Sequence, residues 1–202
     1  MSERIILVRH GETSVNANDK THFYEDPEVL NAKGAEQMKK TALILGRVLP
    51  FVLYCSGEER AKQSAEIISQ ELKVPFKTIE GMQERNWGEL SGKPWSEIKT
   101  ILDQMSLEKR RKFVPTGGES WEQFEERLIK SLDFILERNQ NKTTVIITHG
   151  GVITVLMPYL LNGSEEEALK PNHMFDNGSV TIFEHGESGF TQILLNDTSH
   201  LL

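Results

Sequence analysis

Short apolar runs alternate along the chain with longer stretches in which apolar residues recur every three or four positions. The short runs are β-branched or aliphatic and too brief for helices, which predicts strands. We expect strands at residues 5–8, 51–54, 76–79, 143–148, 179–183 and 190–195. The run TTVIIT at 143–148 is of the kind buried on both faces of a sheet.

The longer amphipathic stretches predict helices between these strands. We expect them at residues 33–47, 56–72, 95–112, 119–138 and 150–161. Ser56 should cap the second helix, because its hydroxyl precedes two glutamates in the first turn. The alternation predicts an α/β fold, a three-layer sandwich with a largely parallel central sheet and helices on both faces. Residues 80–118 interrupt the alternation and predict a short cap-like insertion.

Composition narrows the classes of function. The chain has 202 residues, which suits a single domain over residues 1–202, and its formal net charge of −7 argues against nucleic acid or an anionic membrane as partner. Its single cysteine, Cys55, excludes an internal disulfide and a CxxC metal site. The N-terminus does not read as a signal peptide, and no apolar run approaches the roughly 18 residues of a membrane span. We therefore expect a cytoplasmic protein.

Two predicted strands each end in a histidine. Arg9 and His10 follow the first strand, and His149 and Gly150 follow the strand at 143–148. Ligands of such folds bind beyond the carboxyl ends of the strands, so these side chains should meet there. With Arg60, one turn into the helix after the second strand, they would bind a doubly charged anion, and a neutral imidazole can act as a nucleophile. Either histidine alone would be an ordinary strand-end residue; the pair predicts a site.

Five segments of the chain form an ordered set of motifs. They are residues 9–16 (RHGETSVN), 30–37 (LNAKGAEQ), 55–65 (CSGEERAKQSA), 84–92 (ERNWGELSG) and 148–151 (THGG). In this order they resemble the motifs of the histidine phosphatase superfamily, also called phosphoglycerate mutase-like proteins. Departures are mild: asparagine, cysteine and serine stand at positions 31, 55 and 64, where the family usually has threonine, serine and threonine.

The resemblance implies a role for each matching residue. His10 would be the nucleophile that becomes phosphohistidine, and Glu84 would protonate the leaving alkoxide and then activate water. His149 would complete the catalytic set. The phosphoryl group would be bound by the remaining matching residues, Arg9, Asn16, Arg60 and Gly150. The scheme implies no metal and no cofactor, since arginines take the place of a cation.

The family contains hydrolases and mutases, and the sequence favours hydrolysis. Gly151 stands where mutases usually carry asparagine, and residues 115–120 (PTGGES) resemble the phosphatase branch. The chain is also shorter than the cofactor-dependent mutases. The segment ERNWG, however, is close to the mutase version. The basic run at 109–112 is either a solvated helix face or a source of cap contacts from Arg110 and Arg111 to a second anionic group.

These observations predict a phosphoric monoester hydrolase of the histidine acid phosphatase type that acts on a small phosphorylated metabolite. A cofactor-dependent mutase is the alternative, and an inactive phosphate-binding protein on the same fold is a second one. The substrate and any role of His22 stay open. So does the oligomeric state, with a homodimer as one option.

Overall fold

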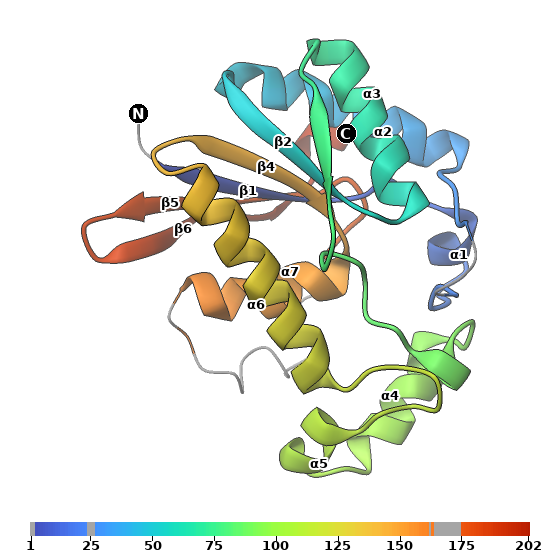
Figure 1. Ribbon diagram of the computed structural model, residues 1–202. Coiled ribbons are helices and arrows are strands. Elements are labelled where there is room, and N and C mark those ends of the chain that lie inside the picture. Colours follow the sequence, from blue (N-terminus) through green and yellow to red (C-terminus); the bar gives the residue numbers. More distant parts are fainter. Residues whose placement is uncertain (1–2, 24–26, 162, 164–174) are drawn as a thin grey trace.

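A six-stranded mixed sheet forms the centre of the computed structural model, which describes residues 3–23, 27–161, 163 and 175–202 (Figure 1). The strands are β1 (Arg4–Arg9), β2 (Phe51–Ser56), β3 (Phe76–Ile79), β4 (Thr143–Thr148), β5 (Val180–Gly186) and β6 (Gly189–Asp197). They lie in the order β3-β2-β4-β1-β5-β6; the first four are parallel to one another, and β5 runs antiparallel to both of its neighbours, β1 and β6. The predicted α/β fold with a largely parallel sheet is confirmed.

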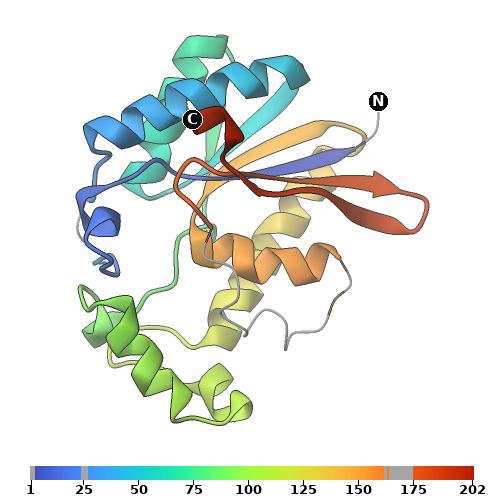
Figure 2. The same cartoon turned by 180° about the vertical axis from the view of Figure 1, so that it is seen from behind.

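Helices cover both faces of this sheet. α2 (Ala32–Leu45) and α3 (Glu59–Leu72) lie on one face, and α6 (Trp121–Arg138) and α7 (Gly150–Leu160) on the other (Figures 1 and 2). In β1, Ile5 and Leu7 pack into the core beneath α6 and α7, whereas Ile6 and Val8 pack beneath α2 and α3. Successive strand residues point to opposite faces, so a strand covered on both sides is apolar throughout. Within the described segments, no helix is long and apolar enough to cross a membrane.

The register of the sheet brings the two histidine motifs together. β4 lies between β1 and β2, and Arg9 is paired with Thr148 at the carboxyl ends of β1 and β4. The amide of His10 then donates to the carbonyl of Thr148 at 2.9 Å. His10 and His149 therefore leave the same edge of the sheet side by side.

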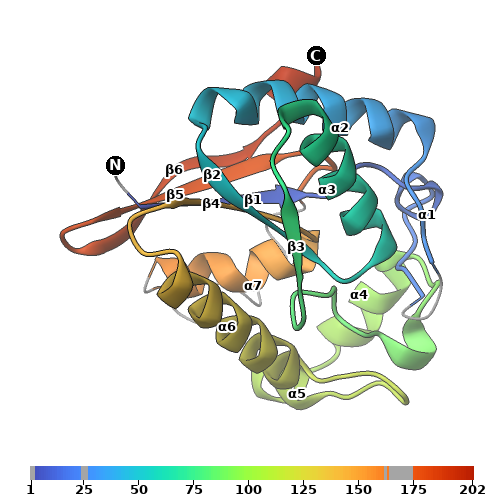
Figure 3. The ribbon, with the colours of Figure 1, turned by 45° about the horizontal axis from the view of Figure 1, so that its top comes forward.

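The excursion expected at 80–118 lies beyond that edge. It contains the 3-10 turn η2 (Gly88–Leu90), α4 (Trp95–Asp103) and α5 (Leu107–Lys112), with a small apolar cluster of its own around Ile98 and Leu102. Figure 3 shows α4 on the same side of the sheet as α1 (Ser14–Ala17). Backbone hydrogen bonds join the two regions, with Thr21 donating to Lys93 and Trp95 donating to Asp19. Two further 3-10 turns are η1 (Gly46–Val48) and η3 (Ser199–Leu201).

Two predicted helices differ from the structure. The single helix expected over 95–112 is two helices, because the hydroxyl of Ser106 accepts from the amide of Lys109 and starts α5 anew. The helix expected from Ser56 begins at Glu59 instead, and Ser56 ends β2. The predicted cap was wrong because the Ser56 hydroxyl is hydrogen bonded to His149, at 2.8 Å.

Candidate functional site

The two histidines lie in contact at the carboxyl edge of the sheet. Their ring centroids are 5.2 Å apart, and both side chains are almost completely buried. The turn after His10 is held against α2 by two glycines, since a Cβ on Gly11 would lie 2.4 Å from the carbonyl oxygen of Gly34. Glycine is therefore required at position 11 for the backbone to approach α2 this closely.

His10 is held in the form that a nucleophile needs. Its Nδ1 lies 2.8 Å from the carbonyl oxygen of Gly11, which can only accept, so Nδ1 carries the proton. Nε2 then keeps its lone pair and accepts from Nε of Arg60 at 3.2 Å. Burial, followed by the nearby charges of Arg60, His149 and Arg9, lowers the pKa of His10 well below its usual range. The imidazole is consequently neutral at physiological pH.

Arg60 is anchored by two carboxylates that the sequence analysis missed. Its Nη1 lies 3.2 Å from Glu28 and its Nη2 lies 3.0 Å from Glu58, all three side chains being deeply buried. A guanidinium carries more N–H hydrogens than these contacts and His10 use, so donors remain for a ligand. Glu58 resembled an ordinary first-turn acid in the sequence, and only its place two residues before Arg60 hinted at the pairing.

Glu58 also fixes His149. Its second oxygen lies 2.8 Å from Nε2 of His149, and the same oxygen accepts from the backbone amide of Glu84 at 2.7 Å. Burial raises the pKa of Glu58, but His149, Arg60 and His22 together lower it below its usual range. One ionised carboxylate thus links an arginine, a histidine and the loop that carries Glu84.

Arg9 and Asn16 complete this side of the site. Arg9 donates to the carbonyl of Phe175, and its buried Nε has no partner within the described segments. A Cβ on Gly150 would be 3.6 Å from that Nε, so the first turn of α7 lies against the guanidinium. Asn177 donates at 3.1 Å both to the carbonyl of His10 and to the side-chain oxygen of Asn16. Arginine N–H groups and the start of a helix are both donors suited to an anion.

Glu84 is oriented by backbone amides. Its two oxygens accept from the amides of Arg85 and Gly151, each at 2.9 Å. A Cβ at Gly151 would lie 2.3 Å from the carboxylate, so any larger residue there would displace Glu84 from this position. Arg127 of α6 supports the loop from behind, donating to the carbonyls of Gln83 and Glu84 at 2.8 and 3.0 Å.

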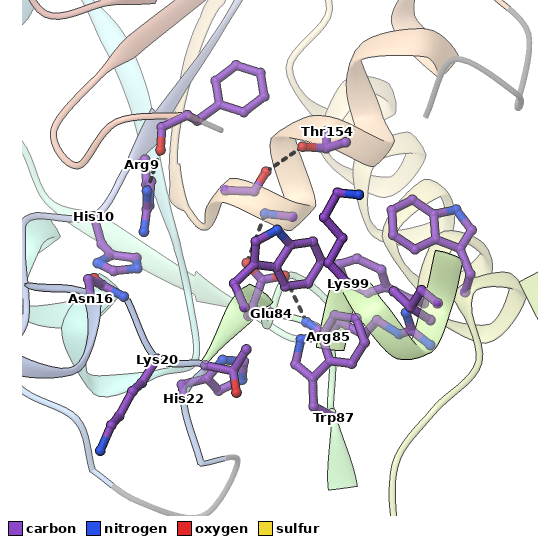
Figure 4. Close-up of a pocket in the computed structure, with 18 of the residues that line it drawn as sticks. Arg9, His10, Asn16, Lys20, His22, Glu84, Arg85, Trp87, Lys99 and Thr154 are labelled. Carbon is purple, nitrogen blue, oxygen red and sulfur yellow. Dashed lines mark hydrogen bonds between the residues drawn. The ribbon is translucent and has the colours of Figure 1, made fainter. Parts of the chain in front are cut away.

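A cavity of about 240 Å³ joins these groups. In Figure 4 Arg9, His10 and Asn16 lie on one side of the cavity, Glu84 lies in the middle, and Trp87 and Lys99 lie on the other side. The remaining predicted site residues on its wall are Arg60, Gly150 and Arg110, whereas His149 is buried behind it. His22 also lines the cavity, 3.8 Å from Glu58, and burial followed by the charge of Arg60 lowers its pKa to about 4.

The two arginines expected to contact a ligand from the cap separate in the structure. Arg110 lines the cavity and donates to Asp103 and to the carbonyl of Leu102, at 3.1 and 3.0 Å. Arg111 lies outside the cavity wall and pairs with Glu125 of α6 at 3.1 Å. The expected cap contact is therefore restricted to Arg110, because α5 turns its neighbour towards α6.

We next consider side chains that could bind a metal ion. No cluster of three or more His, Cys, Asp or Glu side chains suited to a metal ion occurs within the part of the chain that the structure describes. Next to the cavity, Glu58 instead pairs with Arg60 and His149.

Comparison with known proteins places this site in a family. A family model described as the histidine phosphatase superfamily (branch 1) matches residues 5–198. The chain is 31% identical to phosphoglycerate mutase-like protein 4 of Arabidopsis thaliana, over 98% of this chain and 86% of that one. It is 29% identical to the metal-independent phosphoserine phosphatase of the same plant, over 98% and 82% of the two chains. The superposition on the solved structure of Bacillus stearothermophilus YhfR covers 100% of this chain and 100% of that one, with a TM-score of 0.85 and 26% sequence identity.

The relatives of this chain include proteins named as phosphatases and proteins named as phosphoglycerate mutases. The match extends over nearly the whole chain and includes every segment that contributes to the cavity. With its paired histidines, anchored arginine and amide-held glutamate, this chain belongs to the histidine phosphatase superfamily.

Proposed function

We propose that the protein is a metal-independent phosphomonoesterase that hydrolyses a small phosphorylated metabolite through a phosphohistidine on His10. The observation that carries the proposal is the state of His10: a buried, neutral imidazole on the cavity wall, with its proton on Nδ1 and a lone pair on Nε2, the nitrogen that faces Arg60. A phosphohistidine requires a nitrogen with these properties.

In the first step, Nε2 of His10 attacks phosphorus and the bond from phosphorus to the ester oxygen breaks. Glu84 gives a proton to the departing alkoxide. In the second step, a water attacks the phosphohistidine while Glu84 takes its proton, and the N–P bond breaks to release phosphate. Glu84 lies in the middle of the cavity, between the histidine and the side that would hold the alcohol (Figure 4). One carboxylate can serve as acid and then as base.

The charge of the transferring group would be met by Arg9, Arg60 and His149, with the start of α7 adding backbone donors. Glu28 and Glu58 keep Arg60 in place, so little reorganisation is needed when a phosphoryl group enters. Preorganised donors of this kind lower the barrier because their alignment precedes the reaction.

The names of relatives support a small phosphate ester as substrate. They include the Arabidopsis phosphoserine phosphatase and an adenosylcobalamin/alpha-ribazole phosphatase of Escherichia coli. A cytoplasmic location would suit such a substrate. Other relatives are named 2,3-bisphosphoglycerate-dependent phosphoglycerate mutases, so mutase activity is the alternative. Gly151, pressed against Glu84 where mutases usually carry asparagine, favours hydrolysis.

The proposal is tested by hydrolysis of 4-nitrophenyl phosphate and by isomerisation of 3-phosphoglycerate, each measured for wild type and His10→Ala. We expect metal-independent phosphate release, a loss of about a thousandfold or more in His10→Ala, and negligible isomerisation. His185→Ala is the matched control, because His185 is exposed on β5 outside the cavity. Isomerisation that exceeds phosphate release would establish the mutase. Absence of both activities in wild type would favour a phosphate-binding protein.

A further inference from the structure

The chain has three tryptophans, and all of them line the same cavity. Trp87 follows the Glu84 loop, Trp95 begins α4, and Trp121 begins α6. Three separate segments therefore bring their indoles to one place. Figure 4 shows Trp87 on the side of Glu84 away from Arg9 and His10, which is where the alcohol of a bound phosphomonoester would lie.

The indole rings are packed against other aromatic rings and form one wall of the cavity. Trp87 and Trp95 pack edge to face, with centroids 5.7 Å apart and planes at 69°. Trp121 packs in the same manner against Phe124, at 5.9 Å and 82°. In an edge-to-face pair, the ring that presents its edge does not have its own faces covered by the partner ring. The face of an aromatic ring attracts another flat ring, which either stacks on it with an offset or approaches it edge-on.

Arg85 holds this wall in position. Its guanidinium carbon lies 4.2 Å from the ring centroid of Trp87 and 5.8 Å from that of Trp121. The side chain is 2% exposed and donates to the carbonyls of Phe113 and Glu119. Burial lowers the pKa of Arg85 to about 10, so it remains a cation at neutral pH and its contact with the indoles persists.

Two of the cations that line the cavity on the side of the excursion are already paired, whereas Lys20, from the loop after α1, lies exposed at the cavity wall. Arg110 and Lys99 both bind Asp103, and α4 and α5 supply all three side chains. A ligand with a second anionic group would have to compete with this carboxylate. Next to α4 and α5, the charge therefore favours a neutral alcohol moiety over an acidic one.

The size of the cavity limits the ligand. An apolar cavity of about 150 Å³ suffices for a benzene ring. The observed cavity of about 240 Å³ therefore has room for a phosphoryl group and one ring. We propose that Trp87, Trp95 and Trp121, held by Arg85, form a subsite for a single flat ring in the alcohol part of the phosphomonoester. This inference rests on the proposed function, since it assigns the substrate class of that same site.

The test compares benzyl phosphate with cyclohexylmethyl phosphate and propyl phosphate. All three release primary alkoxides of similar basicity, so differences in kcat/KM report recognition of the alcohol rather than leaving-group chemistry. We expect kcat/KM for benzyl phosphate to exceed that for cyclohexylmethyl phosphate by about threefold to tenfold, the scale of one aromatic contact. The propyl ester should be the poorest of the three.

Two substitutions of Trp95 distinguish the effect of an aromatic side chain at this position from the effect of its apolar volume. Trp95→Leu should lower the benzyl-to-cyclohexylmethyl ratio towards one, and Trp95→Phe should restore most of it. Phe134→Leu is the control, because Phe134 is an exposed aromatic residue of α6 outside the cavity, and it should leave the ratio as in wild type. A wild-type ratio near one, or a ratio that Trp95→Leu does not change, would overturn the subsite.

A binding measurement tests the subsite independently of the proposed phosphatase activity. Benzylphosphonate, cyclohexylmethylphosphonate and propylphosphonate cannot be hydrolysed, and their affinities for wild type are measured by calorimetry. Tighter binding of benzylphosphonate without turnover of any ester would support the subsite and overturn the phosphatase proposal. Turnover of the esters with equal phosphonate affinities would overturn the subsite and leave the phosphatase standing.

Discussion

The two halves of the cavity are built on different principles. The phosphate half consists of residues at strand ends and helix starts, in which buried charges are paired, such as Arg60 with Glu28 and Glu58. The tryptophan half comes mainly from the excursion at 80–118 and the start of α6, and it consists of aromatic rings around one buried guanidinium. On the proposed function, the sheet would hold the groups for phosphoryl transfer, and the excursion would select the alcohol that is esterified to the phosphate.

This contrast has a kinetic consequence. Substitutions in the phosphate half should lower kcat for every substrate, because they act on groups that each reaction uses. Substitutions in the tryptophan half should change the ranking of substrates. The following predictions test whether the two halves separate in this way.

After His10→Ala, the largest effect on kcat is expected from a methyl group beside Glu84. Gly151→Ala would place a Cβ 2.3 Å from the carboxylate, so Glu84 must move and lose the amide of residue 151 as its partner. We expect kcat to fall by about a hundredfold for benzyl and propyl phosphate alike, the scale of a displaced general acid. Gly150→Ala is the matched variant, since its Cβ would meet Arg9 at an ordinary 3.6 Å, and its loss should be several times smaller.

Equal losses in the two alanine variants would show that α7 tolerates no side chain at its start, irrespective of Glu84. A loss in Gly151→Ala that depended on the substrate would break the separation of the two halves.

A smaller effect concerns stability at acidic pH. Burial and then the charge of Arg60 lower the pKa of His22 from 6.5 to about 4 in the folded protein, so the unfolded chain binds the proton first. Stability contributed by neutral His22 is therefore present above pH 6.5 and declines as pH falls towards 4. At about 1.4 kcal/mol per pKa unit, we expect the free energy of unfolding to drop by about 2 to 3 kcal/mol between pH 7 and 4.5. His10 adds a change of the same sign.

Urea unfolding at several pH values measures this dependence, and His22→Gln should make it shallower. The window ends at pH 4.5 because Glu58, whose pKa is lowered, begins to lose its own contribution below that value. An unchanged slope in His22→Gln would mean that this histidine is not held neutral.

Much of the fold and the centre of the site could be predicted from local pattern. β-Branched runs such as 143–148 predicted strands because a strand covered on both faces is buried at every position and shows no alternation of polar residues. His10 and His149 could be placed together because parallel strands end at one edge of the sheet. Arg60 could be added because it stands one turn into the helix that follows the second strand, whereas Glu84 depended on the motifs of the family.

What could not be predicted depends on contacts between distant segments. Glu58 resembled a first-turn helix acid and no motif marked Glu28, because nothing local shows that both bind the same buried arginine. Ser56 looked like a helix cap, and the competing partner, His149, lies far along the chain. Trp95 and Trp121 appeared as the apolar positions of two helices, and only the folded excursion shows that they face one cavity with Trp87.

The central claim is that His10 forms a covalent bond to the phosphoryl group. Wild type and His10→Ala are mixed with 4-nitrophenyl phosphate, quenched in alkali within the first turnovers, and digested for mass spectrometry. The account predicts phosphate on His10 of wild type, stable in base, lost in acid and absent from His10→Ala. Full hydrolytic activity without a phosphorylated residue, or with the phosphate on a different residue, would contradict it.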